Sequence, residues 1–171
     1  EKEESGLPTS IRTLQLALLE HDDYYGRNHT ETANLLNSLG IAYQANGDID
    51  KADAAFRDSW KVYEKLGNTS SAGALLILGN WATVAYRKND FVRAEALLLK
   101  ATTLRRDLYG PSAALASMHG NLGKIILKTK RPREALVQLD QALPMTRQYT
   151  GEHSMLTIFI LQSIAEARIQ M

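Results

Sequence analysis

The sequence predicts an all-α fold, a right-handed α-solenoid in which about eight helices stack as antiparallel pairs. Three interleaved series of residues, each with a period of about 42 residues, carry this prediction. The first is a series of glycines with spacings of 41, 43 and 41 residues: Gly26, Gly67, Gly110 and Gly151. In the second, a large apolar residue precedes a small one: Leu39-Gly40, Trp81-Ala82, Leu122-Gly123 and Ile164-Ala165. In the third, an alanine is followed four residues later by a large apolar residue: Ala52 and Phe56, Ala94 and Leu98, Ala135 and Leu139.

Each repeat reads as two amphipathic helices, which we call helix A and helix B. In the first complete repeat, one series of residues falls at i, i+3, i+4 and i+7, which places its members on one face of helix A: Leu36, Leu39, Gly40 and Tyr43. The Gly47-Asp48 pair then interrupts the pattern. A second series resumes it and predicts helix B: Ala52, Phe56, Ser59 and Tyr63. No alternating pattern typical of strands competes with the helices.

The period places the elements along the chain as a half repeat, three complete repeats and a second half repeat. Residues 9–25 are expected to form helix B of a truncated repeat, 31–66, 72–109 and 112–149 the three repeats, and 153–170 helix A of another truncated repeat. A terminal repeat normally presents a polar outer face. The last helix instead carries apolar residues: Ile158, Phe159, Ile160, Leu161, Ile164 and Ile169. We therefore expect flanking repeats in a parent protein, or self-association through the open helical ends.

The helix ends carry their own signals. Asp48 and Asp90 are expected to cap the B helices that follow them, because a carboxylate accepts hydrogen bonds from the free N–H groups of the first turn. Arg131 cannot cap, but Pro132 suits a first helical turn. The glycines of the first series fit the left-handed position that ends a helix. Pro144 is expected to kink or end its helix.

Composition bounds the class of protein. The chain has 171 residues, 44% of them hydrophobic, with 20 basic and 19 acidic side chains, which excludes wholesale disorder. It has no cysteine, so disulfides, thiol nucleophiles and cysteine-bound metals are excluded. Residues 1–50 carry a net charge of −6 and residues 51–171 one of +7. The longest uncharged stretch, 66–86, is interrupted by polar residues and glycines, so we expect no membrane insertion. With no signal peptide visible, the expected location is cytoplasmic.

Motifs for catalysis are not found, so the chain is not expected to be an enzyme or to bind a cofactor or metal. A phosphate-binding loop requires GxxxxGK followed by Ser or Thr, but Gly123-Lys124 is followed by Ile125. No GxGxxG or GxSxG motif appears, and the four histidines never form HExxH. His29 and His153 stand at related places of the repeat, which favours a structural role.

These patterns resemble the tetratricopeptide repeat, and in particular its kinesin-light-chain subtype. The resemblance rests on the period near 42 residues and on three segments: 25–33 (YGRNHTETA), 36–40 (LNSLG) and 120–123 (GNLG). It covers nearly the whole chain. Four positions depart from the family pattern. Trp81 stands where Leu is usual, Asn89 and Lys130 replace the turn glycine present at Gly47, and Pro144 lies inside helix B of the third repeat.

Stacked helix pairs form a concave face lined by A helices, where solenoids usually bind their ligands. Alignment by period places these residues on that face: Asn34, Asn37, Ile41 and Gln44, then Asn80, Thr83, Tyr86 and Arg87, then Ser117, Asn121, Lys124 and Lys128, and finally Phe159, Gln162 and Glu166. An asparagine amide both donates and accepts, so it can bond to the backbone of a peptide whatever its sequence. The resemblance implies such a role for Asn80 and Asn121. The alternative is that these asparagines only solvate or cap helices.

The leading hypothesis is a non-catalytic scaffold that binds a peptide or protein segment in this groove. A basic cluster favours an acidic partner, with solvation of a turn as the alternative: Lys124, Lys128, Lys130, Arg131 and Arg133. A second hypothesis is a regulatory or sensory segment of a larger signalling protein, such as a bacterial serine/threonine kinase or a transcription regulator. Nucleic-acid binding is not expected, because the basic residues lack interleaved aromatics and the chain lacks an overall basic charge.

Overall fold

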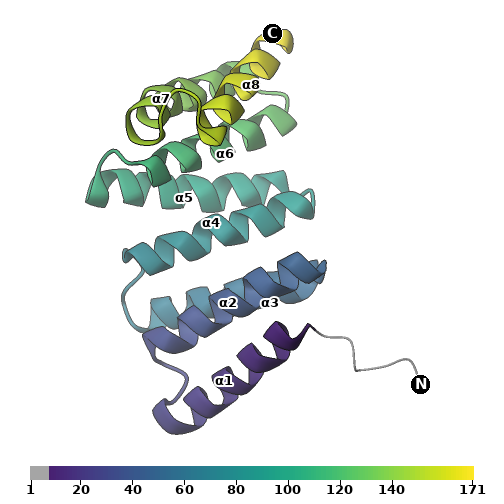
Figure 1. Cartoon of the computed structure of the whole chain (residues 1–171), viewed down its shortest axis with the longest axis vertical. Helices are drawn as coiled ribbons and strands as arrows, with labels where there is room; N and C mark the ends of the chain where they lie inside the picture. Colours follow the sequence, from purple (N-terminus) through teal and green to yellow (C-terminus); the bar gives the residue numbers. More distant parts are fainter. Residues whose placement is uncertain (1–7) are drawn as a thin grey trace, which may run out of the picture. The chain divides into compact units, whose positions relative to one another are not determined.

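The computed structural model describes residues 8–171, and the chain separates into two compact units, 1–88 and 89–171. Over the described residues it contains eight α-helices and no strands (Figure 1). Unit 1 holds four of them: α1 (Thr9–Tyr25), α2 (Thr30–Asn46), α3 (Ile49–Lys65) and α4 (Ala72–Arg87). Unit 2 holds the others: α5 (Phe91–Tyr109), α6 (Ala113–Lys128), α7 (Pro132–Thr150) and α8 (Met155–Ile169). The predicted all-α helical-repeat class is confirmed.

In unit 1 each helix packs on the next, and α2 also contacts α4. Helices α2 and α3 approach each other closely at Gly40. Gly40 lies over the fully buried ring of Phe56, where a Cβ atom would come within 2.6 Å of the ring. Nearby, the buried Ser59 hydroxyl donates a hydrogen bond of 2.6 Å to the carbonyl of Ala33. Gly40, the small residue of the second series, therefore leaves the space that the large Phe56 of the third series occupies.

Unit 2 repeats this arrangement with different side chains. Its helices also pack in succession, and α6 contacts α8 as α2 contacts α4. Gly123 of α6 lies over Leu139 of α7, and a Cβ atom would come within 2.6 Å of the leucine Cγ. The buried His119 of α6 forms a hydrogen bond of 2.9 Å through Nδ1 to the amide oxygen of Gln138. The period in the sequence therefore corresponds to one repeated helix–helix contact.

One of the two predicted aspartate caps is wrong. Asp90 accepts a bond from the backbone N–H of Arg93 at 3.1 Å, as expected. The Asp48 side chain makes no cap bond. Its carboxylate instead accepts from Asn46 Nδ2 at 3.0 Å and lies 3.9 Å from Lys51 Nζ, so neighbouring side chains occupy it.

Three of the helices are capped by serines that the sequence analysis did not single out, and α2 by His29, for which it expected a structural role. Serine hydroxyls accept from the first turns of α4, α6 and α8 at Ser71, Ser112 and Ser154. The imidazole of His29 accepts from the N–H of Glu31 at the start of α2. Ser at an N-cap is a known preference, so this signal was available in the sequence.

The turn between helices A and B keeps one backbone conformation in three repeats. Gly47 has φ 88°, and Asn89 and Lys130, which stand where the family pattern has glycine, have φ 60° and 59°. Asparagine tolerates this left-handed conformation better than lysine does. All four of the predicted helix-ending glycines have positive φ, but the ψ values of Gly26, Gly110 and Gly151 (163°, −167° and 158°) lie outside the left-handed helical region.

Pro144 does not end its helix, because α7 continues to Thr150. Pro144 and Asp140, the residue whose carbonyl loses its partner, are both exposed, so water can satisfy that carbonyl. The assignment of the eight helices to a half repeat, three repeats and a second half repeat stays a prediction.

Candidate functional site

The residues predicted to line a groove all lie on the A-type helices, but they divide between the two units. In unit 1, α2 and α4 carry four each: Asn34, Asn37, Ile41 and Gln44, then Asn80, Thr83, Tyr86 and Arg87. In unit 2, α6 carries four and α8 carries three: Ser117, Asn121, Lys124 and Lys128, then Phe159, Gln162 and Glu166. Each unit is therefore described by itself.

In unit 1, two hydrogen bonds join α2 to α4 across their shared surface. Asn80 Nδ2 donates to Asn37 Oδ1 at 3.0 Å, and Arg87 Nη1 donates to the backbone carbonyl of Gln44 at 3.0 Å. Both bonds join residues 43 positions apart, close to one repeat. We call this area the α2–α4 surface, which comprises Asn34, Asn37, Ile41, Gln44, Leu76, Gly79, Asn80, Thr83 and Arg87.

The Asn37–Asn80 pair keeps hydrogen-bonding capacity for a ligand. A primary amide offers two donors and two acceptor lone pairs. The bond between the two side chains uses one donor of Asn80 and one acceptor position of Asn37. Both residues are half-buried, so their remaining groups stay accessible. The pair thus presents donors and acceptors that the protein itself holds in place.

Two other residues predicted to line the groove, Asn34 and Thr83, use their polar groups in hydrogen bonds to neighbouring residues of unit 1. Asn34 donates to Glu31 at 3.1 Å and accepts from the Tyr63 hydroxyl at 3.4 Å. Burial raises the pKa of that tyrosine above its ordinary value, with the Ser71 hydrogen bond acting in the opposite direction. The Thr83 hydroxyl donates to the carbonyl of Gly79 at 3.1 Å. Tyr86 is half-buried. Sequence periodicity placed these side chains on the right helix without revealing their partners.

In unit 2, the corresponding helices α6 and α8 meet through a cation and an aromatic ring. The Lys124 ammonium lies 5.2 Å from the centroid of the Phe159 ring, within the range of a cation–π contact. Asn121 and Lys128 are exposed on α6. This α6–α8 surface, defined by Asn121, Lys124, Lys128 and Phe159, therefore offers positive charge where the α2–α4 surface offers amides.

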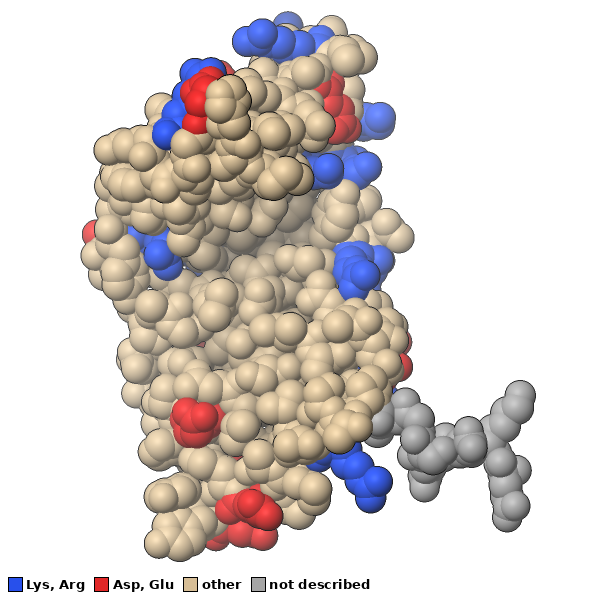
Figure 2. All heavy atoms as spheres, viewed as in Figure 1, with Lys and Arg blue, Asp and Glu red and all other residues tan. Residues whose placement is uncertain are grey.

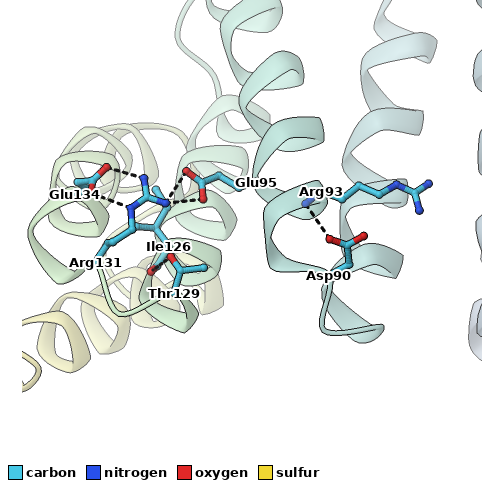
Figure 3. A network of polar contacts seen from close by, with 7 residues as sticks. All are labelled: Asp90, Arg93, Glu95, Ile126, Thr129, Arg131 and Glu134. Carbon is cyan, nitrogen blue, oxygen red and sulfur yellow. Dashed lines mark hydrogen bonds and ion pairs between the residues drawn. The ribbon is translucent and has the colours of Figure 1, made fainter.

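The predicted basic cluster is smaller than the sequence indicated. Arg131 donates to both carboxylate oxygens of Glu95, at 3.1 and 2.8 Å, and to both of Glu134, at 2.8 and 2.6 Å (Figure 3). These bonds raise the pKa of Arg131 above its ordinary value, and the guanidinium lowers the pKa of Glu134. Arg131 thus ties α5 to the start of α7, and its charge is already compensated.

Unit 1 contains a related ion pair that sequence reasoning missed. Lys88 Nζ lies 2.8 Å from Asp50 and 3.5 Å from Asp53, and hydrogen bonds to these carboxylates raise the pKa of Lys88. Asp53 and Glu95 are 42 residues apart, which is one period of the sequence. Asp53 also accepts a 2.6 Å bond from the indole N–H of Trp81. The shared spacing was the available signal.

Unit 1 also has a pocket of about 300 Å³ among α1, α2 and α3. Leu18, Leu36 and Val62 supply apolar lining, and Asp22 and Arg27 form an ion pair of 3.0 Å beside it. None of the predicted groove residues lines this pocket. It therefore lies apart from the α2–α4 surface.

The described residues offer little for metal or acid–base chemistry. Within residues 8–171, no three or more His, Cys, Asp or Glu side chains gather where a metal ion could be held. Burial lowers the pKa of His119 below its ordinary value, and the charge of Arg106 acts in the same direction.

None of the helices in the part of the chain that the structure describes has both the length and the apolar character needed to cross a membrane. On the face drawn in Figure 2, Lys and Arg side chains lie among other residues, which are drawn in tan.

The comparisons agree with the helical repeat. The sequence profile of the family described as Tetratricopeptide repeat matches residues 6–65 and 73–148. The chain is similar to the crystal structure of BtubC (BKLC) from P. vanneervenii, with TM-score 0.81 and 19% identity, over 98% of this chain and 71% of that one. It is similar to a putative kinesin light chain of Podosopora anserina with nearly identical TPR-like repeats, with TM-score 0.80 and 15% identity, over 94% of this chain and 76% of that one.

A much longer relative also matches. The chain is 25% identical over 149 residues to a "Clustered mitochondria protein homolog" of Coccidioides immitis (strain RS). The matched region is 86% of this chain but only 12% of that protein. The chain therefore spans a small part of the curated relative's length.

Proposed function

The chain belongs to the tetratricopeptide repeat family, and on this premise we propose that it captures a peptide segment of a partner protein on the α2–α4 surface. Tetratricopeptide repeats generally mediate protein–protein interaction, and their fold is a non-catalytic scaffold. The observation that carries the finer proposal is the 3.0 Å bond between Asn80 and Asn37. This bond fixes two half-buried amides on adjacent helices while leaving donors and acceptors for a ligand.

The donors and acceptors of the paired amides support a peptide as the ligand. A peptide backbone carries one donor and one acceptor at each residue, so paired amides can bind it without reading its side chains. Exposed Ile41 and Leu76 stand on the same two helices and add apolar contact. The Arg87–Gln44 bond ties α2 to α4 at the far end of the surface. The surface therefore combines fixed polar groups with two apolar side chains.

Asparagine variants test this proposal directly. We expect Asn37→Ala and Asn80→Ala each to weaken peptide binding by up to about tenfold, since a neutral hydrogen bond contributes about 0.5–1.5 kcal/mol. Binding would be measured by fluorescence polarisation with a labelled peptide selected from a random phage-displayed library. Asn68→Ala is the matched control, because Asn68 is an exposed asparagine in the α3–α4 loop. Equal affinities for all three variants and the unmodified chain would contradict the assigned surface.

For unit 2 we propose that the α6–α8 surface favours acidic residues in the partner. Lys124 and Lys128 carry this preference, whereas Arg131 is already paired with Glu95 and Glu134. Exposed charge pairs are screened by salt. Binding of an acidic peptide should therefore weaken with added salt and with Lys128→Ala, while Arg131→Ala should act mainly through stability. Affinity for a neutral peptide should not follow salt.

Two further roles remain proposals. A regulatory segment of a larger protein is favoured by the curated relative, in which the matched region is only 12% of the length. Self-association is favoured by exposed apolar side chains on α1 and α8: Leu16, Leu19, Met155, Ile158, Leu161 and Ile169. Light scattering across a concentration series would test the second, with Leu161→Glu as the variant expected to keep the chain monomeric.

A further inference from the structure

Four aromatic rings gather where α1 ends and α2 begins (Figure 1). The centroid of the His21 ring lies 4.9 Å from that of Tyr25 and 5.1 Å from that of His29. The centroids of Tyr25 and His29 are 5.7 Å apart, and the Tyr24 ring meets Tyr25 edge-on at 4.6 Å. We call His21, Tyr24, Tyr25 and His29 the corner cluster. None of them belongs to the α2–α4 surface or lines the pocket among α1, α2 and α3.

Hydrogen bonds hold both imidazoles of the corner cluster in place. The Thr32 hydroxyl has one proton and donates it to Asp22 at 3.1 Å. The His21 Nδ1 atom, 3.2 Å from the same hydroxyl oxygen, is therefore the donor in that contact. The His29 Nδ1 atom accepts from the backbone N–H of Glu31 at 3.2 Å. Each ring is thus fixed by a residue of the first turn of α2.

The two tyrosines of the corner cluster are exposed. Tyr24 is 81% exposed and Tyr25 is 63% exposed. Among residues 8–171, no Lys or Arg side chain lies over either ring. Tyrosine is enriched among the residues that contribute most to protein interfaces, because it buries a large rigid ring on contact. The ring faces are therefore open to a group from another molecule.

The charge around the corner cluster is negative. Residues 20–31 carry four acidic side chains and one basic side chain, Arg27, which pairs with Asp22 at 3.0 Å. The other three acidic residues form no ion pair within the described part of the chain: Glu20, Asp23 and Glu31. Glu20 stands one turn before Tyr24, on the same side of α1. This uncompensated negative charge favours a cationic group at the exposed rings.

Unit 2 contains a tyrosine that already carries such a cation. Arg105 and Tyr109 follow His21 and Tyr25 by 84 residues, which is two periods of the sequence. The Arg105 guanidinium lies 5.5 Å from the centroid of the Tyr109 ring, within the range of a cation–π contact. Where α5 supplies a guanidinium from its own chain, α1 has only the imidazole of His21.

We propose that the corner cluster binds an arginine side chain from a basic segment of a partner protein. The guanidinium stacks on the exposed ring of Tyr24 or Tyr25, and the carboxylates of residues 20–31 compensate its charge. Arginine is favoured over lysine because its planar guanidinium is weakly hydrated and stacks on aromatic faces. This site lies within unit 1 and does not rest on the α2–α4 surface, so it goes beyond the proposed function.

Phenylalanine and leucine variants separate the aromatic face from apolar bulk. The probe is a fluorescein-labelled peptide of four Arg-Gly repeats, measured by fluorescence polarisation. Tyr24→Phe and Tyr25→Phe keep the ring and should bind within about twofold of the unmodified chain. Tyr24→Leu and Tyr25→Leu should each weaken binding about fivefold, as the loss of an exposed cation–π contact implies. Tyr149→Leu, at an exposed tyrosine of α7, is the matched control and should not change the affinity.

A second peptide tests the charge of the ligand. Citrulline in place of arginine keeps the planar shape but removes the charge, so that peptide should bind at least about tenfold more weakly. Its remaining affinity should be the same for the leucine variants and the unmodified chain. Equal binding of the citrulline and arginine peptides, or leucine variants that bind like the phenylalanine variants, would overturn the proposal.

Histidine resonances locate the bound peptide. The chain has four histidines, of which His21 and His29 belong to the corner cluster, whereas His119 and His153 lie in unit 2. Addition of the arginine peptide should shift the imidazole signals of the first pair in ¹H–¹³C spectra and leave the second pair unchanged. Shifts confined to the second pair would contradict the site. An apparent mass that falls on Tyr24→Leu in light scattering would show that a second copy of the chain covers the rings, and would also contradict it.

Discussion

Units 1 and 2 each contain the same kind of helix–helix contact, but the polar groups around it differ between the units. Gly40 over Phe56 and Gly123 over Leu139 place a helix A glycine against a large helix B residue. Beside the first contact, a serine hydroxyl bonds to a backbone carbonyl. Beside the second, a buried imidazole bonds to a glutamine. Repetition therefore preserves the apolar contact, whereas the polar groups around it are free to differ.

The difference gives each unit its own response to perturbation. In unit 1, the carboxylate of Asp53 forms an ion pair with Lys88 and accepts a hydrogen bond from the indole of Trp81. In unit 2, Arg131 forms ion pairs with two carboxylates, and burial lowers the pKa of His119. Trp60 and Trp81, the only two tryptophans, both lie in unit 1. Tryptophan fluorescence therefore reports on unit 1, while circular dichroism reports on both units.

The largest expected effect on stability comes from removing the large side chain that packs on the helix glycine in each unit. Phe56→Ala and Leu139→Ala each remove a fully buried side chain, which costs about 2–5 kcal/mol of unfolding free energy. In urea, Phe56→Ala should lower the fluorescence midpoint strongly. Leu139→Ala should lower the circular-dichroism midpoint more than the fluorescence midpoint. Equal shifts of both signals by both variants would show that the two units unfold as one and would break the comparison.

A smaller effect separates the two equivalent carboxylates. Asp53→Ala leaves the half-buried indole N–H of Trp81 without its 2.6 Å acceptor and should cost about 1–3 kcal/mol. Glu95→Ala leaves Arg131 with Glu134 and should cost about 1 kcal/mol or less, as partly exposed ion pairs do. Urea unfolding of each variant measures both. A larger loss from Glu95→Ala would mean that the ion pair, and not the indole bond, stabilises this repeat position.

The smallest expected effect is the pH response of His119. Burial lowers the pKa of His119 in the folded chain, so between that value and the ordinary value near 6.5 the unfolded chain binds more protons. The stability contribution is complete above about pH 6.5 and is lost as the pH falls toward the lowered pKa. The circular-dichroism midpoint should decline over this range in the unmodified chain, and less in His119→Gln. An identical decline in the variant would assign the response to other groups.

The local features of the fold could be predicted from the sequence. The apolar spacings around Leu39 and Phe56 identified the two helices of a repeat, and the period carried that reading along the chain. The Asp48 cap was misjudged because its outcome depends on neighbours, and for the same reason Pro144 does not end its helix, while the kink expected there stays a prediction. Asn46 and Lys51 occupy the Asp48 carboxylate, and exposure lets water satisfy the carbonyl that Pro144 leaves free.

The candidate site was predicted less completely. Periodicity placed Asn37 and Asn80 on A helices, but it could not show that their amides bond to one another. The partner of Arg131, Glu95, lies 36 residues away, so the basic cluster was overcounted.

By itself the sequence determined the helices, their period and the small-on-large contact, because helical spacing and repeat length are local properties of the chain. Only the tertiary structure decided which polar side chains meet across helices about 42 residues apart and which cations are already paired. Those outcomes depend on distances of a few ångströms between separate helices, and hydrogen bonds and close contacts vary steeply over such distances.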